Sequence, residues 1–393
     1  MKYLIIKNGR AITPSGIIDA DIIVSDGTII EIANSSDYSV ENAEIIDAER
    51  LYVSPGFIDL HTHGAGGADY MDGTVEAYAT AARMSARHGT TLLYPTTLTS
   101  TNELLYESFD IFEDAIRNVK DGAAFGGLHL EGPYFAFSQK GAQDPRYLRN
   151  PDPSEYMEIL SRTDRIARWS LAPELPGAPD FGKVLRERGI LASMAHTDAT
   201  FEEAVEAFKA GFTHLTHFYS CMSTVTRRNA YRYAGVIEFG YYEDGATIEI
   251  IADGIHVPSS LLHLIYKLKG PERIALVTDS MRAAGMPEGP SILGGLSDGQ
   301  EVIVEDGVAK LPDRTAFAGS VATDDRCIRT MVRDGGVSLE NAVRMMTLTP
   351  AEIMGIQASK GSLEKGKDAD IVLFDDNINV RRTIVKGKSV FVC

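Results

Sequence analysis

The sequence predicts an α/β protein in which a closed (β/α)8 barrel carries a small β-sandwich built from both chain termini. Two observations lead to this fold class. Between Pro55 and about Gln357, short apolar runs alternate with amphipathic stretches, as they do in βα units around a parallel sheet. On either side of that region, short β-type runs are separated by turn residues, which is typical of antiparallel hairpins.

The two terminal segments have the same sequence pattern. In the first, residues 1–54, the run 20–24 is closed by the Asp26-Gly27 turn and the run 29–32 follows it. The second, residues 358–393, has the same short runs of β-branched residues. Neither end alone supplies enough strands to be stable, so we expect them to pair into one discontinuous β-sandwich domain. Residues 55–357 would then form the barrel domain between them.

The central region contains eight strand-like runs, most of them continuously apolar, as expected for strands buried on both faces. They are residues 57–63, 90–96, 125–131, 167–174, 190–197, 214–219, 247–256 and 273–280. Helical stretches intervene at residues 75–88, 102–118, 201–210 and 259–268, with residues 339–348 near the end. Eight such units predict a closed TIM barrel whose functional residues gather at the C-terminal strand ends. Residues 294–314 are expected to form a hairpin inserted after the last strand.

Composition limits the possible partners of the 393-residue chain. Its net charge of −17 opposes binding to nucleic acid or to an anionic membrane, because either would repel the protein. An anionic substrate would therefore need a local cluster of arginines. Three cysteines are too few for a disulfide framework, and the first residues show no signal-peptide pattern, so we expect a cytoplasmic location.

Residues of the kinds that bind metals stand at the ends of five predicted strands. The first strand ends in a His-x-His pair, whose side chains leave the same face because they are two residues apart in an extended chain. A closed barrel brings strand ends to one rim, so we expect the candidates to converge on a cation. Imidazoles combined with a carboxylate suit zinc, or iron or manganese in a more open geometry. The candidates are His61, His63, Glu131, His196, His217 and Asp279.

A metal ion at this rim indicates hydrolytic chemistry. Such an ion lowers the pKa of a bound water from about 16 to about 7 and polarises a carbonyl under attack. Asp279 would take the proton from that water and return it to the leaving group. The expected reaction is hydrolysis of an amide or a related carbon–nitrogen bond, with no redox cofactor.

Simpler roles exist for some of the same residues. Glu131 could cap the loop that follows it and Asp279 could cap a helix, but their joint position at strand ends favours one shared site. His214 and His217 lie three residues apart and face opposite sides of a strand, so we assign His217 to the rim and His214 to the packed core. His256 also ends a predicted strand and could be a further ligand, although we expect a substrate contact.

Several motifs combine into a specific fingerprint that spans nearly the whole chain. They are PGFIDLHTHG at 55–64, HLEGP at 129–133, KGA at 140–142, LAPE at 171–174, HTDAT at 196–200, THF at 216–218, ADGIH at 252–256, TDSM at 278–281 and AGS at 318–320. Together they resemble the amidohydrolase superfamily, and within it the N-acetylglucosamine-6-phosphate deacetylases.

The resemblance assigns a role to each candidate. It implies that Glu131, His196 and His217 hold the main metal ion, that His61 and His63 are available for a second, and that Asp279 is the general base and acid. The implied cofactor is zinc or iron, at one or two ions per subunit, with a carboxylate rather than a modified lysine in the bridging role. The implied reaction removes acetate from N-acetylglucosamine 6-phosphate, a small amino-sugar phosphate, in a homodimer.

Around the substrate the chain departs from the family pattern. Ser220-Cys221 stands where the family has Asn-Ala, which helps to hold the sugar phosphate. The family's arginine that reaches phosphate in the neighbouring subunit falls in residues 226–235, where Arg227 and Arg228 are the candidates. Gln143 replaces a histidine near the reacting carbonyl, and its amide can donate to a developing oxyanion but cannot become a cation.

These departures leave two alternatives open. The first is deacetylation of a related N-acyl substrate, such as N-acetylgalactosamine 6-phosphate. The second is a non-catalytic protein that has kept the barrel, which the complete set of metal-binding residues and Asp279 opposes.

Overall fold

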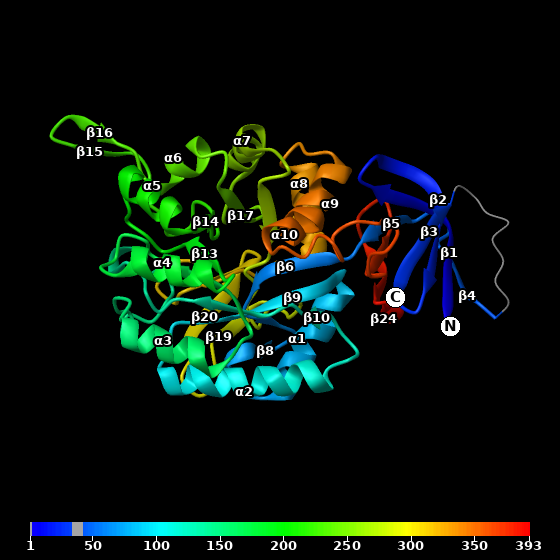
Figure 1. Ribbon diagram of the computed structural model, residues 1–393, viewed down its shortest axis with the longest axis horizontal. Helices are drawn as coiled ribbons and strands as arrows, with labels where there is room; N and C mark the ends of the chain where they lie inside the picture. The colour runs from blue at the N-terminus through cyan, green and yellow to red at the C-terminus, as the bar shows by residue number, and fades with distance from the viewer. Residues whose placement is uncertain (1, 34–41) are drawn as a thin grey trace.

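The computed structural model describes residues 2–33 and 42–393. Met1 and residues 34–41, which fall inside the predicted N-terminal β segment, lie outside the described residues. Within the described ranges, the two chain ends form a sheet at one side of the molecule, and the middle of the chain forms a barrel of parallel strands surrounded by helices (Figure 1).

The terminal sheet joins the two ends of the chain, as the sequence predicts. Its strand order is β24-β23-β22-β5-β1-β2-β3, with β4 also paired to β1, and the link between the two ends is the antiparallel pair β5 and β22. Its strands are β1 (Tyr3–Thr13), β2 (Gly16–Ser25), β3 (Thr28–Ala33), β4 (Glu44–Asp47), β5 (Tyr52–Pro55), β22 (Ile371–Phe374), β23 (Val380–Val385) and β24 (Lys388–Val392).

The expectation of purely antiparallel pairing is wrong for two of these strands. Strands β1, β2 and β3 pair antiparallel in sequence, but β4 and β5 both run parallel to β1. Tight turns fix the direction of the first three strands, whereas β4 and β5 return to β1 only after β2 and β3 intervene, where no hairpin turn dictates their direction. Apolar side chains from both chain ends, including Ile22, Val24, Ile371 and Leu373, fill one core between these strands.

The barrel contains all eight predicted strands. They pair in parallel in the order β9-β11-β12-β13-β14-β17-β18, and β6 pairs with β9. The circle closes between β18 and β6 through a parallel bridge of Thr62 with Ser280 and through the Asp279 N–H, which donates to the His61 carbonyl at 2.8 Å. The strands are β6 (Phe57–Thr62), β9 (Thr90–Thr97), β11 (Leu128–Glu131), β12 (Ile166–Leu171), β13 (Leu191–Met194), β14 (Phe212–Leu215), β17 (Thr247–Ile251) and β18 (Ile274–Val277).

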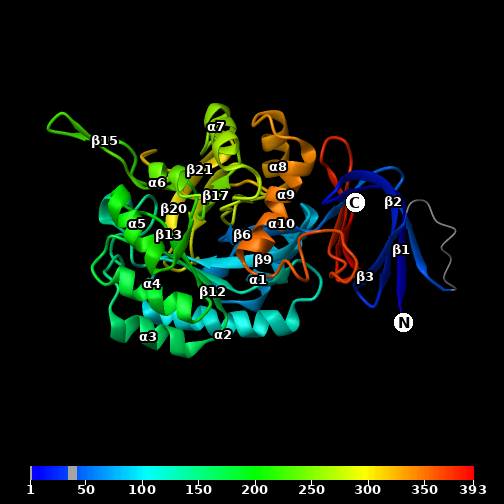
Figure 2. The ribbon, with the colours of Figure 1, turned by 45° about the horizontal axis from the view of Figure 1, so that its top comes forward.

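Helices cover the outside of the barrel (Figures 1 and 2). They are α1 (Val75–Arg87), α2 (Asn102–Asn118), α3 (Pro153–Arg162), α4 (Ala178–Glu187), α5 (Phe201–Ala210), α6 (Val236–Tyr242), α7 (Ser259–Lys269), α8 (Asp324–Arg333), α9 (Leu339–Met346) and α10 (Leu348–Ile353). The predicted helix 339–348 is divided at Thr347, because the ring of Pro350 would clash with the Met346 carbonyl in a continuous helix. Among the residues described, no helix has the length and apolar character required to cross a membrane.

Two insertions flank the mouth of the barrel. The predicted hairpin after the last strand is a three-stranded antiparallel sheet of β19 (Gly289–Leu293), β20 (Gln300–Glu305) and β21 (Val308–Lys310). The second is a hairpin of β15 (Thr226–Arg228) and β16 (Tyr231–Tyr233), which projects from the body (Figures 1 and 2). We call residues 226–233 the arm. Smaller elements are β7 (Gly64–Ala65), β8 (Ala68–Asp69), β10 (Ala124–Phe125), η1 (Tyr70–Asp72) and η2 (Phe137–Gln139).

The packing around Trp169 gives a test of the fold. Its indole is fully buried on β12, stacks on Tyr134 at 5.9 Å, and donates from Nε1 to the Gly132 carbonyl at 2.8 Å. Trp169→Ala is therefore expected to lower the free energy of unfolding by about 3–5 kcal/mol. Circular dichroism in urea measures this, because Trp169 is the sole tryptophan and its fluorescence would be lost. Phe137→Ala, at an exposed ring, is the control, and an equal loss there would contradict the assignment.

Candidate active site

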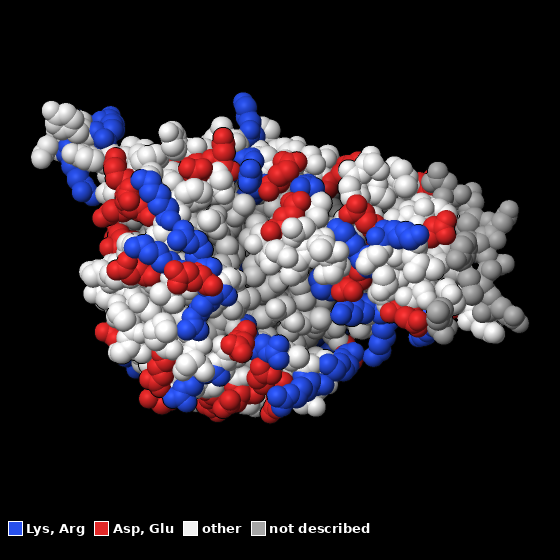
Figure 3. Space-filling model, in the orientation of Figure 1, with Lys and Arg blue, Asp and Glu red and all other residues white. Residues whose placement is uncertain are grey.

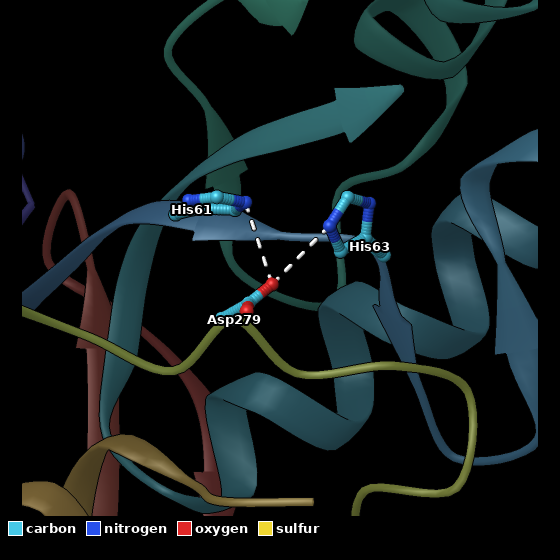
Figure 4. A group of neighbouring side chains, drawn as sticks. All are labelled: His61, His63 and Asp279. Atoms are coloured by element: carbon cyan, nitrogen blue, oxygen red, sulfur yellow. Dashed lines mark ion pairs between the residues drawn. The ribbon is translucent and has the colours of Figure 1, made fainter. Parts of the chain in front are cut away.

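All six predicted metal-binding residues meet at the C-terminal mouth of the barrel. They form two groups, in each of which the three candidate ligand atoms lie within 4.8 Å of one another. We call Glu131, His196 and His217 the first cluster, and His61, His63 and Asp279 the second cluster. Figure 4 shows His61, on β6, and His63, directly after its end, projecting toward the Asp279 carboxylate, at 3.4 and 3.2 Å from their Nε2 atoms.

Glu131 lies between the two clusters. Its Oε1 is 3.0 Å from His217 Nε2 and 3.4 Å from His196 Nε2, and it is also 3.5 Å from His61 Nε2. Its Oε2 is 3.4 Å from His63 Nε2. The carboxylate therefore faces ligands of both clusters, which is the position that a bridging carboxylate between two ions would take.

Four of these side chains do not leave from the strands themselves: His63 directly follows β6, and the other three lie farther beyond their strands. Strands β13, β14 and β18 end two residues before His196, His217 and Asp279, so the prediction that the strands extend through these residues is wrong. All three have positive φ, at 45°, 29° and 47° respectively. Left-handed backbone is uncommon for such residues and is held only where the surroundings enforce it. The turn after each strand redirects the side chain over the barrel mouth.

The outer nitrogen of three imidazoles is fixed by a partner behind the site. His196 Nδ1 lies 2.7 Å from the Gln139 carbonyl and His63 Nδ1 lies 3.3 Å from the Thr96 carbonyl. His61 Nδ1 lies 2.7 Å from Glu249 Oε1. Since each partner is an acceptor, each Nδ1 carries a hydrogen, and each Nε2 faces the site, where it can present a lone pair to a metal ion that displaces its proton.

The buried carboxylates of the site favour the binding of a cation. Burial disfavours the charged form of His63, but the Asp279 and Glu131 carboxylates outweigh it and raise the His63 pKa to about 10. Burial would raise the pKa of Glu131, yet His61 and the neighbouring imidazoles hold that pKa well below its usual range. Protons on the imidazoles thus offset the carboxylates when no ion is bound, and a metal ion would displace them.

The donor set fits a divalent metal ion. His61 Nε2 is buried and, among the described residues, has no hydrogen-bond partner, although it points between Glu131 and Asp279. Such an orphaned acceptor is costly unless something occupies the space before it. Four imidazoles with two carboxylates form a mixed nitrogen and oxygen set that suits zinc or iron.

A cavity of about 370 Å³ opens over both clusters, a size that suits a small-molecule ligand. Four of the predicted substrate contacts line it, namely Gln143, Ser220, Cys221 and His256. Arg227 and Arg228 do not, because they lie exposed on the arm. Ligand binding in this cavity would therefore bring a substrate directly against the two clusters.

The amide of Gln143 is already engaged. Its Oε1 accepts from the Thr99 N–H at 3.0 Å, so its Nε2 faces Glu131 and donates to Oε2 at 2.7 Å. The sequence-based expectation was a contact with the reacting carbonyl. In this geometry Gln143 instead orients the carboxylate that stands between the clusters.

His256 is also held from behind. Its Nδ1 lies 2.8 Å from Asp253 Oδ2, and Asp253 Oδ1 accepts from two backbone N–H groups of the same loop. The ring packs against Phe317 at 4.6 Å between centroids. With its Nδ1 hydrogen donated to Asp253, its Nε2 is left as an acceptor for a ligand in the cavity.

The sequence analysis did not identify two buried charged residues that lie below the clusters. Glu249 on β17 and Arg168 on β12 are fully buried and form an ion pair at 2.6 Å. Burial would raise the pKa of Glu249, but Arg168 and His61 hold it well below its usual range. A sequence signal did exist, since each is a lone charged residue inside an apolar strand. His214, assigned to the core from the sequence, is buried there and contacts Glu249 through Nε2 at 3.2 Å.

Comparison with known proteins fits this geometry. The sequence profile of the amidohydrolase family matches residues 52–390. The chain belongs to the amidohydrolase family. It is 33% identical to the N-acetylglucosamine-6-phosphate deacetylase of Lysinibacillus sphaericus, over 98% of this chain and 97% of the relative. It is 31% identical to the N-acetylgalactosamine-6-phosphate deacetylase of Escherichia coli O157:H7, over 98% of each chain.

Solved structures agree with the fold of this amidohydrolase. The N-acetylglucosamine-6-phosphate deacetylase of Pasteurella multocida superposes with a TM-score of 0.91 at 28% identity, over 98% of this chain and 99% of the other. The TIM barrel and the sheet built from both termini, predicted from the sequence, are thereby confirmed.

The position of Glu131 between the clusters predicts how metal binding will respond to mutation. Glu131→Gln removes the charge facing both clusters, so the affinity for every bound ion is expected to fall by more than the about 10–100-fold that loss of a residue behind the ligands costs. His63→Ala removes a ligand from the second cluster only, so the first cluster is expected to keep its ion. Metal per chain, measured by mass spectrometry after gel filtration, checks both.

His263→Ala is the matched control, because that ring lies on α7 and contacts the Gly335 carbonyl at 3.3 Å, away from the site. Equal metal content in Glu131→Gln and in the control would contradict a shared role for the carboxylate.

Proposed function

We propose that this protein hydrolyses N-acetylglucosamine 6-phosphate to glucosamine 6-phosphate and acetate. The observation that carries the proposal is the pair of metal-binding clusters around Glu131, with Asp279 facing a cavity of about 370 Å³. The likeness to deacetylases of N-acetylated sugar phosphates over nearly the whole chain supports the choice of an acetamido substrate.

The cofactor proposed is zinc or iron, at one or two ions per chain. Glu131, His196 and His217 would hold the main ion, and His61 and His63 with Asp279 would hold a second. A divalent ion in such a site supplies activation of water at neutral pH and polarisation of the amide carbonyl. The protein's own contribution is to fix the ligands, exclude bulk water and move protons.

Asp279 is the proposed proton carrier. Burial would raise the pKa of its carboxyl group, but His61 and His63 outweigh burial and lower it, so the carboxylate form is present at neutral pH. It can accept the proton released as water adds to the amide carbon, and it can deliver that proton to the nitrogen as the carbon–nitrogen bond breaks. His256, anchored by Asp253, is proposed to accept a hydrogen bond from a sugar hydroxyl.

Binding of the phosphate requires a positive charge that one copy of the chain does not place in the cavity. Among the described residues that line it, none is lysine or arginine. The arm carries Arg227, Arg228 and Arg232, all exposed, and Figure 3 shows basic side chains on this projection. We therefore propose a homodimer in which Arg227 or Arg228 on the arm of one copy reaches the cavity of the other.

The same observation favours a second candidate function. A cavity without a basic residue, bordered by Ser220 and Cys221, also suits an N-acylated amine other than N-acetylglucosamine 6-phosphate. N-acetylgalactosamine 6-phosphate carries the same phosphate, so its candidacy rests instead on the relative that is named for it.

Domain roles and location complete the proposal. Residues 55–357 would form the catalytic domain, and residues 1–54 with 358–393 the supporting β-sandwich. The net charge of −17 and the three free cysteines support a cytoplasmic enzyme without nucleic-acid or membrane partners.

A panel of acetylated substrates tests the proposed activity. Acetate release is expected to be fastest from N-acetylglucosamine 6-phosphate, slower from its galactosamine counterpart, and slowest from N-acetylglucosamine. Asp279→Asn should lower kcat by about 10²–10⁴-fold, because the amide cannot take the proton. Turnover of only unphosphorylated substrates would overturn the sugar-phosphate assignment, and full activity in Asp279→Asn would overturn the proton-carrier role.

Mixing two variants with complementary defects, assayed at low concentration of the phosphorylated substrate, tests the arm. Arg227→Ala/Arg228→Ala should raise KM for the phosphorylated substrate without raising it for the unphosphorylated one. Mixed with Asp279→Asn, it should recover about a quarter of wild-type activity, because half of the dimers would each hold one intact site with an intact arm from the other copy. No recovery on mixing would show that the arm serves its own chain or no site at all.

A further inference from the structure

The buried ion pair below the clusters has no part in the reaction proposed above. Glu249 and Arg168 are both 0% exposed, and neither lines the cavity. Arg168 Nη1 donates to Glu249 Oε2 at 2.6 Å and to the Leu60 carbonyl at 3.1 Å, while Nη2 donates to Thr216 Oγ1 at 3.1 Å. A buried ion pair is not by itself a source of stability, because desolvation offsets the attraction. Its position therefore points to another purpose.

Glu249 contacts one residue of each cluster. Its Oε1 lies 2.7 Å from the Nδ1 of His61, in the second cluster. The same oxygen accepts the backbone N–H of His217, in the first cluster, at 3.1 Å. His217 is one of the residues with left-handed backbone, at a φ of 29°. One carboxylate thus holds a ring of one cluster and a strained turn of the other.

The contacts of Glu249 define which nitrogen of His61 carries the hydrogen. The Arg168 guanidinium and the His217 N–H can only donate, so both carboxylate oxygens act as acceptors. His61 Nδ1 must then donate to Oε1, and Nε2 is left to face Asp279 and Glu131 as the ligand atom for a metal ion. Backbone carbonyls place the hydrogen on Nδ1 of His63 and His196 in the same way. No side-chain substitution removes those carbonyls.

We propose that Glu249 is a positioning residue for metal binding: held by Arg168, it fixes the tautomer and direction of His61 and anchors the turn at His217. Its main effect falls on the second cluster, where His61 is a ligand. The inference rests on the proposed metal-dependent function, and it adds a residue that controls affinity without touching metal or substrate. Partners of this kind change metal affinity by about 10–100-fold.

Glu249→Gln tests the proposal with almost no change in shape. An amide offers one acceptor oxygen in place of two. If that oxygen faces His61 and His217, the amide NH₂ meets the Arg168 guanidinium; if it faces Arg168, the NH₂ meets the His61 and His217 donors. The oxygen is expected to face Arg168, because a buried guanidinium left without an acceptor costs more than a neutral donor does, so the NH₂ meets His61 and the ring should lose its fixed tautomer.

The measurement is the affinity of the apoprotein for Co²⁺, by calorimetry and by the visible spectrum of the bound ion. In Glu249→Gln, the Co²⁺ site of the second cluster is expected to lose about 10–100-fold in affinity. Nitrogen-15 spectra of the histidines should show loss of the single His61 tautomer. These readouts would not move if Glu249 served only to stabilise the fold.

Two controls separate positioning from stability. Asp72→Asn breaks another ion pair, between the half-buried Asp72 and the buried Arg282 at 2.6 Å, and should lower thermal stability without changing Co²⁺ affinity. Arg168→Met/Glu249→Leu removes both charges together, which should restore stability relative to Glu249→Gln while Co²⁺ affinity stays low. If the double variant is too unstable to purify, Glu249→Gln and Asp72→Asn are compared at equal loss of stability.

Each outcome decides the proposal. Unchanged Co²⁺ affinity and an unchanged His61 tautomer in Glu249→Gln would overturn it, as would recovery of affinity together with stability in the double variant. Wild-type protein that binds no Co²⁺ would overturn both this inference and the metal site. Weakened binding in a protein that releases acetate from none of the panel substrates would support the inference while removing the proposed substrate.

Discussion

Negative charge buried at the mouth of the barrel is the constraint around which this site is organised. Glu131, Asp279 and Glu249 are all buried, and an isolated buried carboxylate is costly unless a charge or several donors compensate it. Arg168 compensates Glu249 directly. Glu131 and Asp279 instead face four imidazoles, which take up protons or share a cation with them. The balance of charges across both clusters thus favours a bound cation.

The closed barrel makes this concentration of charge possible. Asp59 on β6 accepts from the Thr278 hydroxyl at 2.5 Å and from the backbone N–H groups of His61 and Thr278, which ties the first strand to the last beside the site. The turns after β13, β14 and β18 then direct His196, His217 and Asp279 over the mouth. Because these turns carry strained backbone, they depend on anchors such as the Glu249 carboxylate at His217.

The residues proposed for catalysis and those proposed for phosphate binding lie in different parts of this molecule. One copy of the chain brings together every residue proposed to bind metal and to move the proton. The basic residues suited to phosphate are on the projecting arm, away from the cavity of the same copy. In the proposed homodimer, catalysis would depend on the barrel of one copy and phosphate recognition on the arm of the other. This division would also explain why the arm can differ in sequence from the family pattern while the clusters are complete.

The sequence by itself determined the barrel, the joining of the two termini, helices such as 102–118 and 201–210, and the six residues that meet at the mouth. These depend on local periodicity and on the rule that strand ends of a closed barrel share one rim. Only the tertiary structure decided the parallel direction of β4 and β5, the contact of Gln143 with Glu131, and the pairing of Arg168 with Glu249, 81 residues apart. A side chain's partner across a barrel depends on registers and turns set by the whole chain, and no local pattern encodes them.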